Sequence, residues 1–324
     1  MSGAWGSIPH MTTPSIKLTR SPLAPTPMEL DAQQDAAVAH RGSPLLIAGG
    51  PGTGKTSVLI AAALSRITAG QDPDSILLLT YGRQRASELR DAIALRTTST
   101  MHEPLARTFH SLAYSILKMN SGDSYHEPIL LSGPEQENFI EQLLQGDVED
   151  GYRQWPDDLH DGEGKKGNPL LTQGFIRELR DLIMRDNERG ISPDELAQRG
   201  KTVGEKYWAP AADFWQRYKQ VMAIREDAAG DAKMRIDPSE LISVTIAHLL
   251  ANEDLRAQLQ ARFKTIMVDE YQESDPAQRA LLALLTGSDL VIAYDADSAV
   301  GRFRGADPDG LKGEVDKYLA QGAT

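Results

Sequence analysis

A glycine-rich turn followed by a lysine and a threonine is the first group of residues whose spacing predicts chemistry. It runs from Gly49 to Thr56 and fits the pattern G-x-x-x-x-G-K-[ST]. Glycine allows backbone N–H groups to approach phosphate oxygens closely. Lys55 would neutralise the β- and γ-phosphates, and the Thr56 hydroxyl would bind Mg²⁺. The candidate phosphate-loop residues before this lysine are Gly50, Pro51, Gly52, Thr53 and Gly54.

Two acids at the end of an apolar run form a second candidate group. Residues 263–268 have the pattern of a buried strand, and Asp269 and Glu270 follow directly. Open parallel sheets bind ligands at the carboxyl ends of their strands. Asp269 is placed to hold Mg²⁺, often through water, and Glu270 would orient or deprotonate the attacking water. Acids after a strand also serve as helix caps, but the phosphate loop in the same chain favours the catalytic interpretation.

A glutamine lies ahead of the phosphate loop, in a segment with helical spacing. Leu30, Gln34, Ala37 and Val38 recur at helical intervals, and Asp31 is placed to cap the helix. The amide of Gln34 carries a donor and an acceptor, and so is able to read an adenine edge. Taken alone, the segment favours a glutamine that faces solvent.

The elements that must position these residues alternate between apolar runs and helical patterns. Continuous apolar runs are typical of strands that are buried on both faces of a parallel sheet. Arginines open the helix that follows residues 75–81, where they would meet either a phosphodiester or solvent. The expected strands cover residues 45–48, 75–81, 106–111, 263–268 and 289–293, and the expected helices cover residues 28–38, 57–64, 82–90, 112–118, 238–250, 253–261 and 276–285.

The stretch from about residue 122 to residue 230 differs in character. Helical patterns at 134–145, 173–186 and 208–225 are separated by polar turns, and the polar residues 157–169 are expected to form a mobile loop. We expect a small local core built from aromatic side chains rather than a base-stacking surface. These aromatic residues are Trp208, Phe214, Trp215 and Tyr218. The stretch is therefore interpreted as a helical insertion within an α/β domain.

Composition limits the class of protein. The chain has 324 residues, a net charge of −12 and no cysteine. This negative net charge argues against a surface that is basic throughout and binds nucleic acid, but it allows a local basic cleft. The lack of cysteine excludes disulfides and thiolate metal sites, and fits a cytoplasmic location. No run approaches the roughly 18 apolar residues that a membrane span needs, and no secretory signal is visible, so we expect no membrane partner.

Taken in this order, the segments resemble the superfamily 1A DNA helicases of the UvrD, Rep and PcrA type, with RecB-like and AdnA-like recombination motors as relatives. The resemblance covers about residues 28–307. Its motifs are a Q motif at residues 30–38, motif I at 49–56, motif Ia at 79–88, motif Ib at 108–111, motif II at 268–278 and the end of motif III at 303–307.

The resemblance implies a RecA-like P-loop fold, an α/β parallel sheet with helices on both faces, interrupted by a helical subdomain. Residues 1–27, rich in Pro, Ser, Gly and Thr, would be a disordered leader. Residues 28–111 and 236–324 would form the RecA-like 1A domain, and residues 112–235 the helical 1B insertion.

The resemblance also implies an ATP- and Mg²⁺-dependent motor of DNA repair or recombination, moving 3′ to 5′ on single-stranded DNA or at duplex/single-strand junctions. Gln34 would read adenine, and Lys55, Thr56, Asp269 and Glu270 would take the roles argued above. Gln272 would link the γ-phosphate site to DNA. The implied DNA contacts are Thr80, Tyr81, Phe109, His110, Phe303 and Arg304.

The chain departs from the family pattern in three ways. The phosphate-sensing glutamine of motif III has no counterpart in residues 293–302, so this loop is not expected to sense the γ-phosphate directly. Ser57 replaces an arginine common beside motif I and, together with the long helix after Thr56, leans towards the recombination motors. Nothing after Asp307 resembles the motifs of a second RecA-like lobe. We therefore expect this chain to be the ATP-binding half of a motor, with a low rate of ATP hydrolysis by itself. The alternatives are a non-catalytic nucleotide-binding subunit of a helicase–nuclease complex and a P-loop kinase, although motif II speaks against the kinase.

Overall fold

The computed structural model describes residues 28–119, 128–159, 167–228, 235–287, 289–295 and 297–300, with Ala306 and Gly313. The expected leader, residues 1–27, lies outside the described residues, as do Phe303 and Arg304. Part of the expected mobile loop, residues 160–166, lies outside them too.

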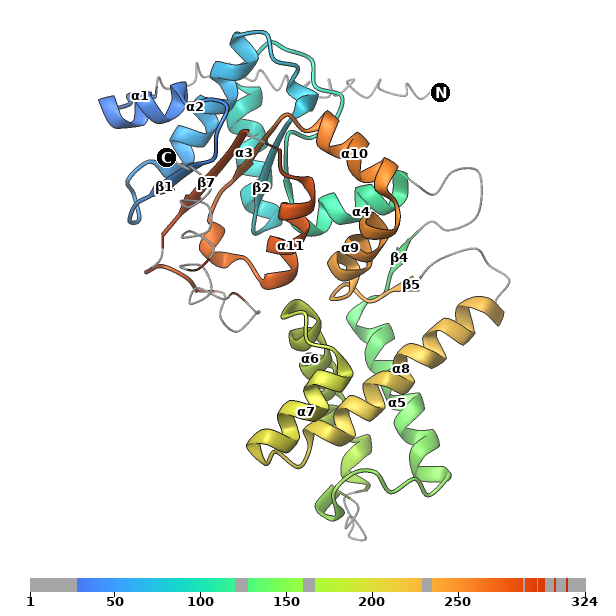
Figure 1. Ribbon diagram of the computed structural model, residues 1–324. Helices are drawn as coiled ribbons and strands as arrows, with labels where there is room; N and C mark the ends of the chain where they lie inside the picture. The colour runs from blue at the N-terminus through green and yellow to red at the C-terminus, as the bar shows by residue number, and fades with distance from the viewer. Residues whose placement is uncertain are drawn as a thin grey trace, which may run out of the picture.

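A five-stranded sheet forms the centre of the larger body (Figure 1). Its strands are parallel throughout and follow the order β1-β7-β6-β2-β3. The strands are β1 (Leu45–Ala48), β2 (Ile76–Thr80), β3 (Ala106–Thr108), β6 (Thr265–Val268) and β7 (Asp289–Tyr294). The order places the strand before the phosphate loop, β1, two positions from the strand before the acid pair, β6. The expected parallel α/β fold is confirmed.

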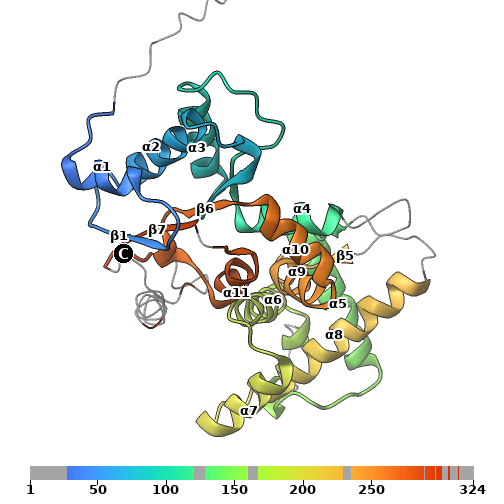
Figure 2. The same ribbon diagram turned by 45° about the horizontal axis from the view of Figure 1, so that its top comes forward.

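Helices cover both faces of this sheet (Figures 1 and 2). Successive strand side chains point to opposite faces, so Ile76 and Leu78 pack in one core while Leu77 and Leu79 pack in the other. This double burial accounts for the continuous apolar run in β2. The helices on the first face are α1 (Ala32–Ala39), α2 (Lys55–Thr68) and α3 (Arg83–Ala94); those on the second are α4 (Phe109–Met119), α9 (Leu241–Ala251), α10 (Glu253–Arg262) and α11 (Pro276–Leu285).

Local sequence signals set the ends of several helices. The carboxylate of Asp31 caps α1, and Gln34 completes a capping box with it. The carboxylate of Asp275 does the same for α11, where Pro276 takes the first helical position. Short 3₁₀ helices connect other elements: η1 (Pro73–Ser75), η2 (Asp157–Leu159), η3 (Pro169–Leu171) and η4 (Tyr271–Glu273).

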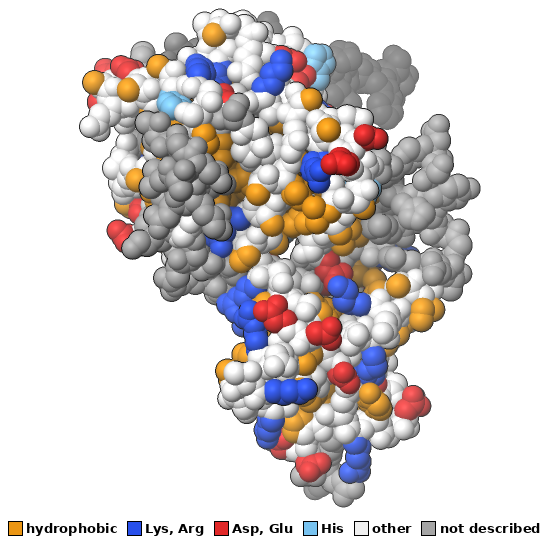
Figure 3. Space-filling view, in the orientation of Figure 1, with side chains coloured by type: hydrophobic (Ala, Val, Ile, Leu, Met, Phe, Trp, Pro, Cys, Tyr) orange, Lys and Arg blue, Asp and Glu red, His pale blue; other side chains and the backbone are white. Residues whose placement is uncertain are grey.

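Four helices form a second body with its own core: α5 (Gly133–Glu149), α6 (Gln173–Glu188), α7 (Pro193–Val203) and α8 (Trp208–Ala228). Phe214, Trp215 and Tyr218 are buried in this core and Trp208 packs against it, as expected for a local core. Acidic and basic side chains are interspersed on the face of this body that Figure 3 shows. Among the described residues, no helix combines the length and apolar character needed to cross a membrane.

A polar junction connects the two bodies. The short strands β4 (Ile129–Leu130) and β5 (Arg235–Ile236) pair in parallel. Beside them, the amide of Gln136 in α5 donates to the carboxylate of Asp237, and Asn187 Nδ2 in α6 donates to Ser239 Oγ at 3.0 Å. These buried bonds connect the helical body to the segment that leads back into the sheet domain.

Helix α4 packs with the sheet rather than with the helical body. Phe109, Leu112 and Ile116 all lie in the core beneath α9 and α11. The boundary expected at residue 112 therefore falls inside α4, and we propose that the inserted subdomain begins after this helix and ends near β5.

Candidate nucleotide-binding site

The phosphate loop joins β1 to α2 at the carboxyl edge of the sheet. Gly52 and Gly54 have φ angles of 76° and 84°, in the left-handed region that residues with a Cβ rarely adopt. Gly54 is the N-cap of α2, and no side chain caps this helix. The first N–H groups of α2 thus remain for an anion at its positive end.

Lys55 lies over this loop. Its ammonium donates to the backbone oxygens of Gly49 at 2.6 Å and Gly50 at 2.8 Å. The Thr53 hydroxyl also donates to Gly50, at 2.8 Å. A Cβ at Gly49 would lie only 2.7 Å from that hydroxyl oxygen, so any larger residue at the first position of the motif would displace the Thr53 side chain. The lysine charge is therefore held within the loop, where phosphate charge would be neutralised.

Thr56 meets Asp269 across the carboxyl edge of the sheet. The threonine hydroxyl lies 3.0 Å from Asp269 Oδ2 and 3.3 Å from Oδ1, although 213 residues separate the two in sequence. Burial, followed by the charge of Glu270, raises the pKa of the Asp269 carboxyl; the Thr56 bond and Arg85 act in the opposite direction. The sequence had predicted these two residues as metal ligands, and the structure brings them together.

The oxygen atoms of this pair fit Mg²⁺, which prefers hard oxygen ligands and is usually bound by one or two protein groups together with phosphates and water. In the part of the chain that the structure describes, no group of three or more His, Cys, Asp or Glu side chains is arranged to hold a metal alone. A cation at Thr56 and Asp269 would therefore be shared with the nucleotide.

Glu270 has a φ of 57°, and it is the one non-glycine residue with a positive φ among the described residues. Such a conformation costs on the order of 1–3 kcal/mol and is concentrated at functional sites. Gln272 contacts this glutamate, because its Nε2 lies 2.5 Å from Glu270 Oε2. The amide oxygen of Gln272 accepts a bond from the backbone nitrogen of Asp295 at 2.9 Å. The strained turn after β6 thus places both predicted catalytic side chains beside the loop that follows β7.

Gln34 contacts the phosphate loop directly. Its Nε2 donates to the backbone oxygen of Thr53 at 3.0 Å, while its Oε1 accepts from the backbone nitrogen of Asp31 at 3.0 Å. The amide therefore supports the loop and caps α1. One further N–H and one lone pair of the same amide remain for an adenine edge, so the sequence-based role stays a prediction.

Arg85 is the site residue that sequence reasoning misplaced. Its Nη2 donates to Thr56 Oγ1 at 2.8 Å, and its Nε lies 3.5 Å from Asp269 Oδ2. The sequence suggested a phosphodiester or solvent as its partner. The contact follows instead from the sheet order, because β2 pairs with β6 and α3 begins just after β2. Spacing alone carries no signal for it.

Four of the predicted DNA contacts lie in the described part of the chain, where β2 leads into α3 and β3 into α4, but not all four are accessible. Thr80 and Phe109 are each only 1% exposed, and Phe109 belongs to the main core. The ring of Tyr81 lies 5.2 Å from that of Phe109, centroid to centroid. His110 is half-buried, and burial together with the charge of Arg83 lowers its pKa. Both Thr80 and Phe109 side chains are buried in this structure, and their contact with DNA stays a prediction.

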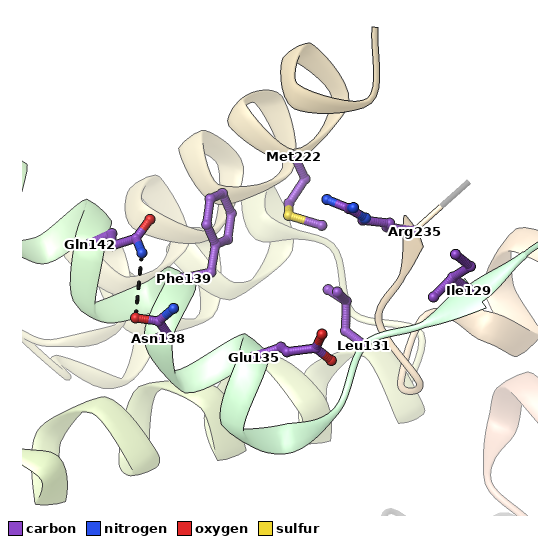
Figure 4. Close-up of a pocket in the computed structure, with 8 residues that line it drawn as sticks. All are labelled: Ile129, Leu131, Glu135, Asn138, Phe139, Gln142, Met222 and Arg235. Atoms are coloured by element: carbon purple, nitrogen blue, oxygen red, sulfur yellow. Dashed lines mark hydrogen bonds between the residues drawn. The ribbon is translucent and has the colours of Figure 1, made fainter. Parts of the chain in front are cut away.

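A cavity of about 410 Å³ lies away from the phosphate loop, at the junction of α5, α8 and the β4–β5 pair (Figure 4). Its lining is mainly apolar side chains and amides, with Glu135 and Arg235 as the charged groups. The lining residues are Ile129, Leu131, Glu135, Asn138, Phe139, Gln142, Met222 and Arg235. This lining is poorly suited to a triphosphate, so the loop at Gly49–Thr56 remains the candidate nucleotide site.

Comparison with known proteins agrees with the geometry. The family model for the UvrD/REP helicase N-terminal domain matches residues 30–318. The ATP-dependent DNA helicase UvrD1 of Mycobacterium tuberculosis is 28% identical over 306 residues, which cover 88% of this chain and 36% of that protein.

Two further relatives extend the same pattern. DNA helicase II of Escherichia coli is 25% identical over 287 residues, covering 87% of this chain and 35% of that protein. The ATP-dependent DNA helicase Rep of Buchnera aphidicola is 23% identical over 294 residues, covering 88% of this chain and 40% of that protein. The chain therefore spans between a third and two fifths of the length of these relatives.

Proposed function

The chain belongs to the UvrD/Rep helicase family, and on that premise we propose that it is the ATP-binding part of an ATP-dependent 3′ to 5′ DNA helicase or translocase. The observation that carries the proposal is the contact of Thr56 Oγ1 with Asp269 Oδ2 at 3.0 Å. It joins the phosphate loop to the acid pair, which is the arrangement that nucleotide hydrolysis requires.

Each residue of the site has a task in this proposal. Lys55 neutralises the β- and γ-phosphates, while Thr56 and Asp269 hold Mg²⁺ against them. The metal supplies positive charge where phosphate charge develops. Glu270 orients or deprotonates the attacking water, and the amide of Gln272 keeps the glutamate in position.

We place single-stranded DNA at the starts of α3 and α4, where Tyr81 and His110 follow β2 and β3. Parallel strands present their carboxyl ends at the same edge, so this surface adjoins the nucleotide site. Movement of the loop after β7 would reach Glu270 through Gln272. The biological setting that we propose is DNA repair or recombination in the cytoplasm.

A non-catalytic subunit of a helicase–nuclease complex is less well supported. A subunit freed from catalysis would have no need of the full set of Lys55, Thr56, Asp269 and Glu270, yet all four stand in this chain. A nuclease-bearing partner nevertheless remains compatible with an active motor.

The proposal is tested with Lys55→Ala, which removes the phosphate-loop charge. We expect at least about a 100-fold loss of DNA-stimulated ATP hydrolysis, a size typical of removing one group that stabilises the transition state. Binding of a fluorescent ATP analogue with Mg²⁺ should weaken in parallel. Lys201→Ala, at an exposed position of α7, is the matched control. Equal affinity of the two variants for the fluorescent ATP analogue would refute the assignment.

A further inference from the structure

Arg85 places a positive charge on the two predicted metal ligands. Its guanidinium bonds Thr56 Oγ1 through Nη2 at 2.8 Å and lies 3.5 Å from Asp269 Oδ2 through Nε. The two oxygens are themselves hydrogen-bonded to one another at 3.0 Å. A single arginine from α3 therefore contacts both halves of the site, one from the start of α2 and one from the end of β6.

A divalent cation bound to the same oxygens would lie within a few ångströms of this guanidinium. Mg²⁺ binds its oxygen ligands at about 2.0–2.1 Å, which is closer than a hydrogen bond. Two cations at such a separation repel each other strongly, since the interior near Asp269 is shielded from water. The side chain of Arg85 cannot keep both contacts when the metal binds.

An alternative position is available to Arg85 on its own helix. Its Nη1 already lies 3.4 Å from Glu88 Oε2, one turn further along α3. The Arg85 side chain is 40% exposed and that of Glu88 is 51% exposed, so the arginine can turn away from the site without unpacking the core. Asp269, by contrast, is fully buried and stays in place.

From these contacts we infer that Arg85 is a placeholder cation, which holds Thr56 and Asp269 together and is exchanged for the divalent metal. When the metal arrives, the guanidinium moves towards Glu88. Arg85 is thus a positioning residue that competes with the metal. Metal binding therefore changes the position of a side chain in the first turn of α3. The inference rests on the proposed function, because that function supplies the metal at Thr56 and Asp269.

The test uses electron paramagnetic resonance to measure binding of Mn²⁺, an observable substitute for Mg²⁺, to the chain saturated with a non-hydrolysable ATP analogue. Arg85→Ala should bind Mn²⁺ about tenfold more tightly than the wild type, because a competing charge has been removed. Arg85→Gln keeps a hydrogen-bonding group but loses the charge, and should show the same gain. Arg83→Ala removes the same charge from an exposed position in the same turn, and should leave Mn²⁺ affinity unchanged.

Asp269→Asn separates failure of the inference from failure of the site. Combined with Arg85→Ala, it should abolish the gain in Mn²⁺ affinity. If Asp269→Asn lowers Mn²⁺ affinity but Arg85→Ala leaves it unchanged or weakens it, the placeholder role is refuted while the metal site stands. If Asp269→Asn has no effect in either background, the proposed metal site itself fails, and the placeholder role fails with it.

Discussion

The side-chain amide of Gln272 connects Glu270 to the backbone of Asp295. Its nitrogen lies 2.5 Å from Glu270 Oε2, and its oxygen accepts from the Asp295 nitrogen at 2.9 Å. Gln272 is 1% exposed, so water does not compete for these bonds. Asp295 follows β7 directly, and a shift of the loop after β7 would therefore move Glu270.

Gln272→Ala should separate hydrolysis from nucleotide binding. We expect ATP hydrolysis to fall by about 100-fold, a typical contribution of a positioned acid or base. Affinity for a fluorescent ATP analogue should hardly change, because Gln272 has no contact with the phosphate loop. Gln278→Ala removes a buried amide that caps α11, and serves as the control. Wild-type hydrolysis by Gln272→Ala would show that the link is not used.

Gln34→Ala tests whether this amide reads the base or only supports the loop. Loss of its bond to Thr53 weakens the binding of every nucleotide, whereas loss of an adenine contact weakens ATP alone. We expect ATP affinity to fall about tenfold and GTP affinity by less than about threefold, as for removal of one polar contact to the base. The adjacent exposed Gln33→Ala is the control. Equal losses for ATP and GTP would leave loop support as the only role.

The sequence was most informative where local chemistry decides structure. The glycines of the phosphate loop allow the left-handed φ angles that this turn needs, and the apolar run of β2 fits a strand that is buried on both faces. Each of these patterns therefore indicates one local structure. The same holds for the acid pair after β6, which parallel pairing brings to the carboxyl edge. Helix α7 was not anticipated, although Ser192 and Pro193 at its start and Gly204 at its end are ordinary helix signals.

Contacts between distant segments were less predictable. Arg85 meets Thr56 only because β2 and β6 are neighbours in the sheet, and sequence spacing does not encode that order. An aromatic residue such as Phe109 can fill a core or stack on a base, and its type alone does not distinguish the two. The left-handed backbone of Glu270 is likewise imposed by its surroundings, since glutamate has no local preference for it.

The buried ion pair between Arg66 and Asp289 should dominate the electrostatic stability of the sheet domain. Arg66 is 1% exposed and bonds both carboxylate oxygens of Asp289, at 2.8 and 3.0 Å. Asp289→Ala leaves a buried charge without its partner, so the free energy of unfolding should fall by about 3–5 kcal/mol. Glu195→Ala breaks the exposed pair with Arg199 and should cost less than about 1 kcal/mol. Urea unfolding measures both, and equal costs would contradict this ranking.

Asp275 should make the stability of the chain fall as pH rises towards neutrality. Burial raises its pKa from 3.8 to about 7, despite the bond that it accepts from the Gln278 backbone nitrogen. The folded chain therefore holds this proton more tightly than the unfolded chain. Between about pH 4 and pH 7 unfolding releases the proton, so increasing pH favours the unfolded state across that window.

Asp275→Asn isolates this effect, because asparagine still caps a helix but does not titrate. The thermal midpoint of the variant should exceed that of the wild type at pH 8, and the two should converge near pH 4. Asp194→Asn, at an exposed position in the first turn of α7, should leave the pH profile as it is. A constant difference between Asp275→Asn and wild type from pH 4 to pH 8 would instead mean that Asp275 is charged throughout, with the cap bonds outweighing burial.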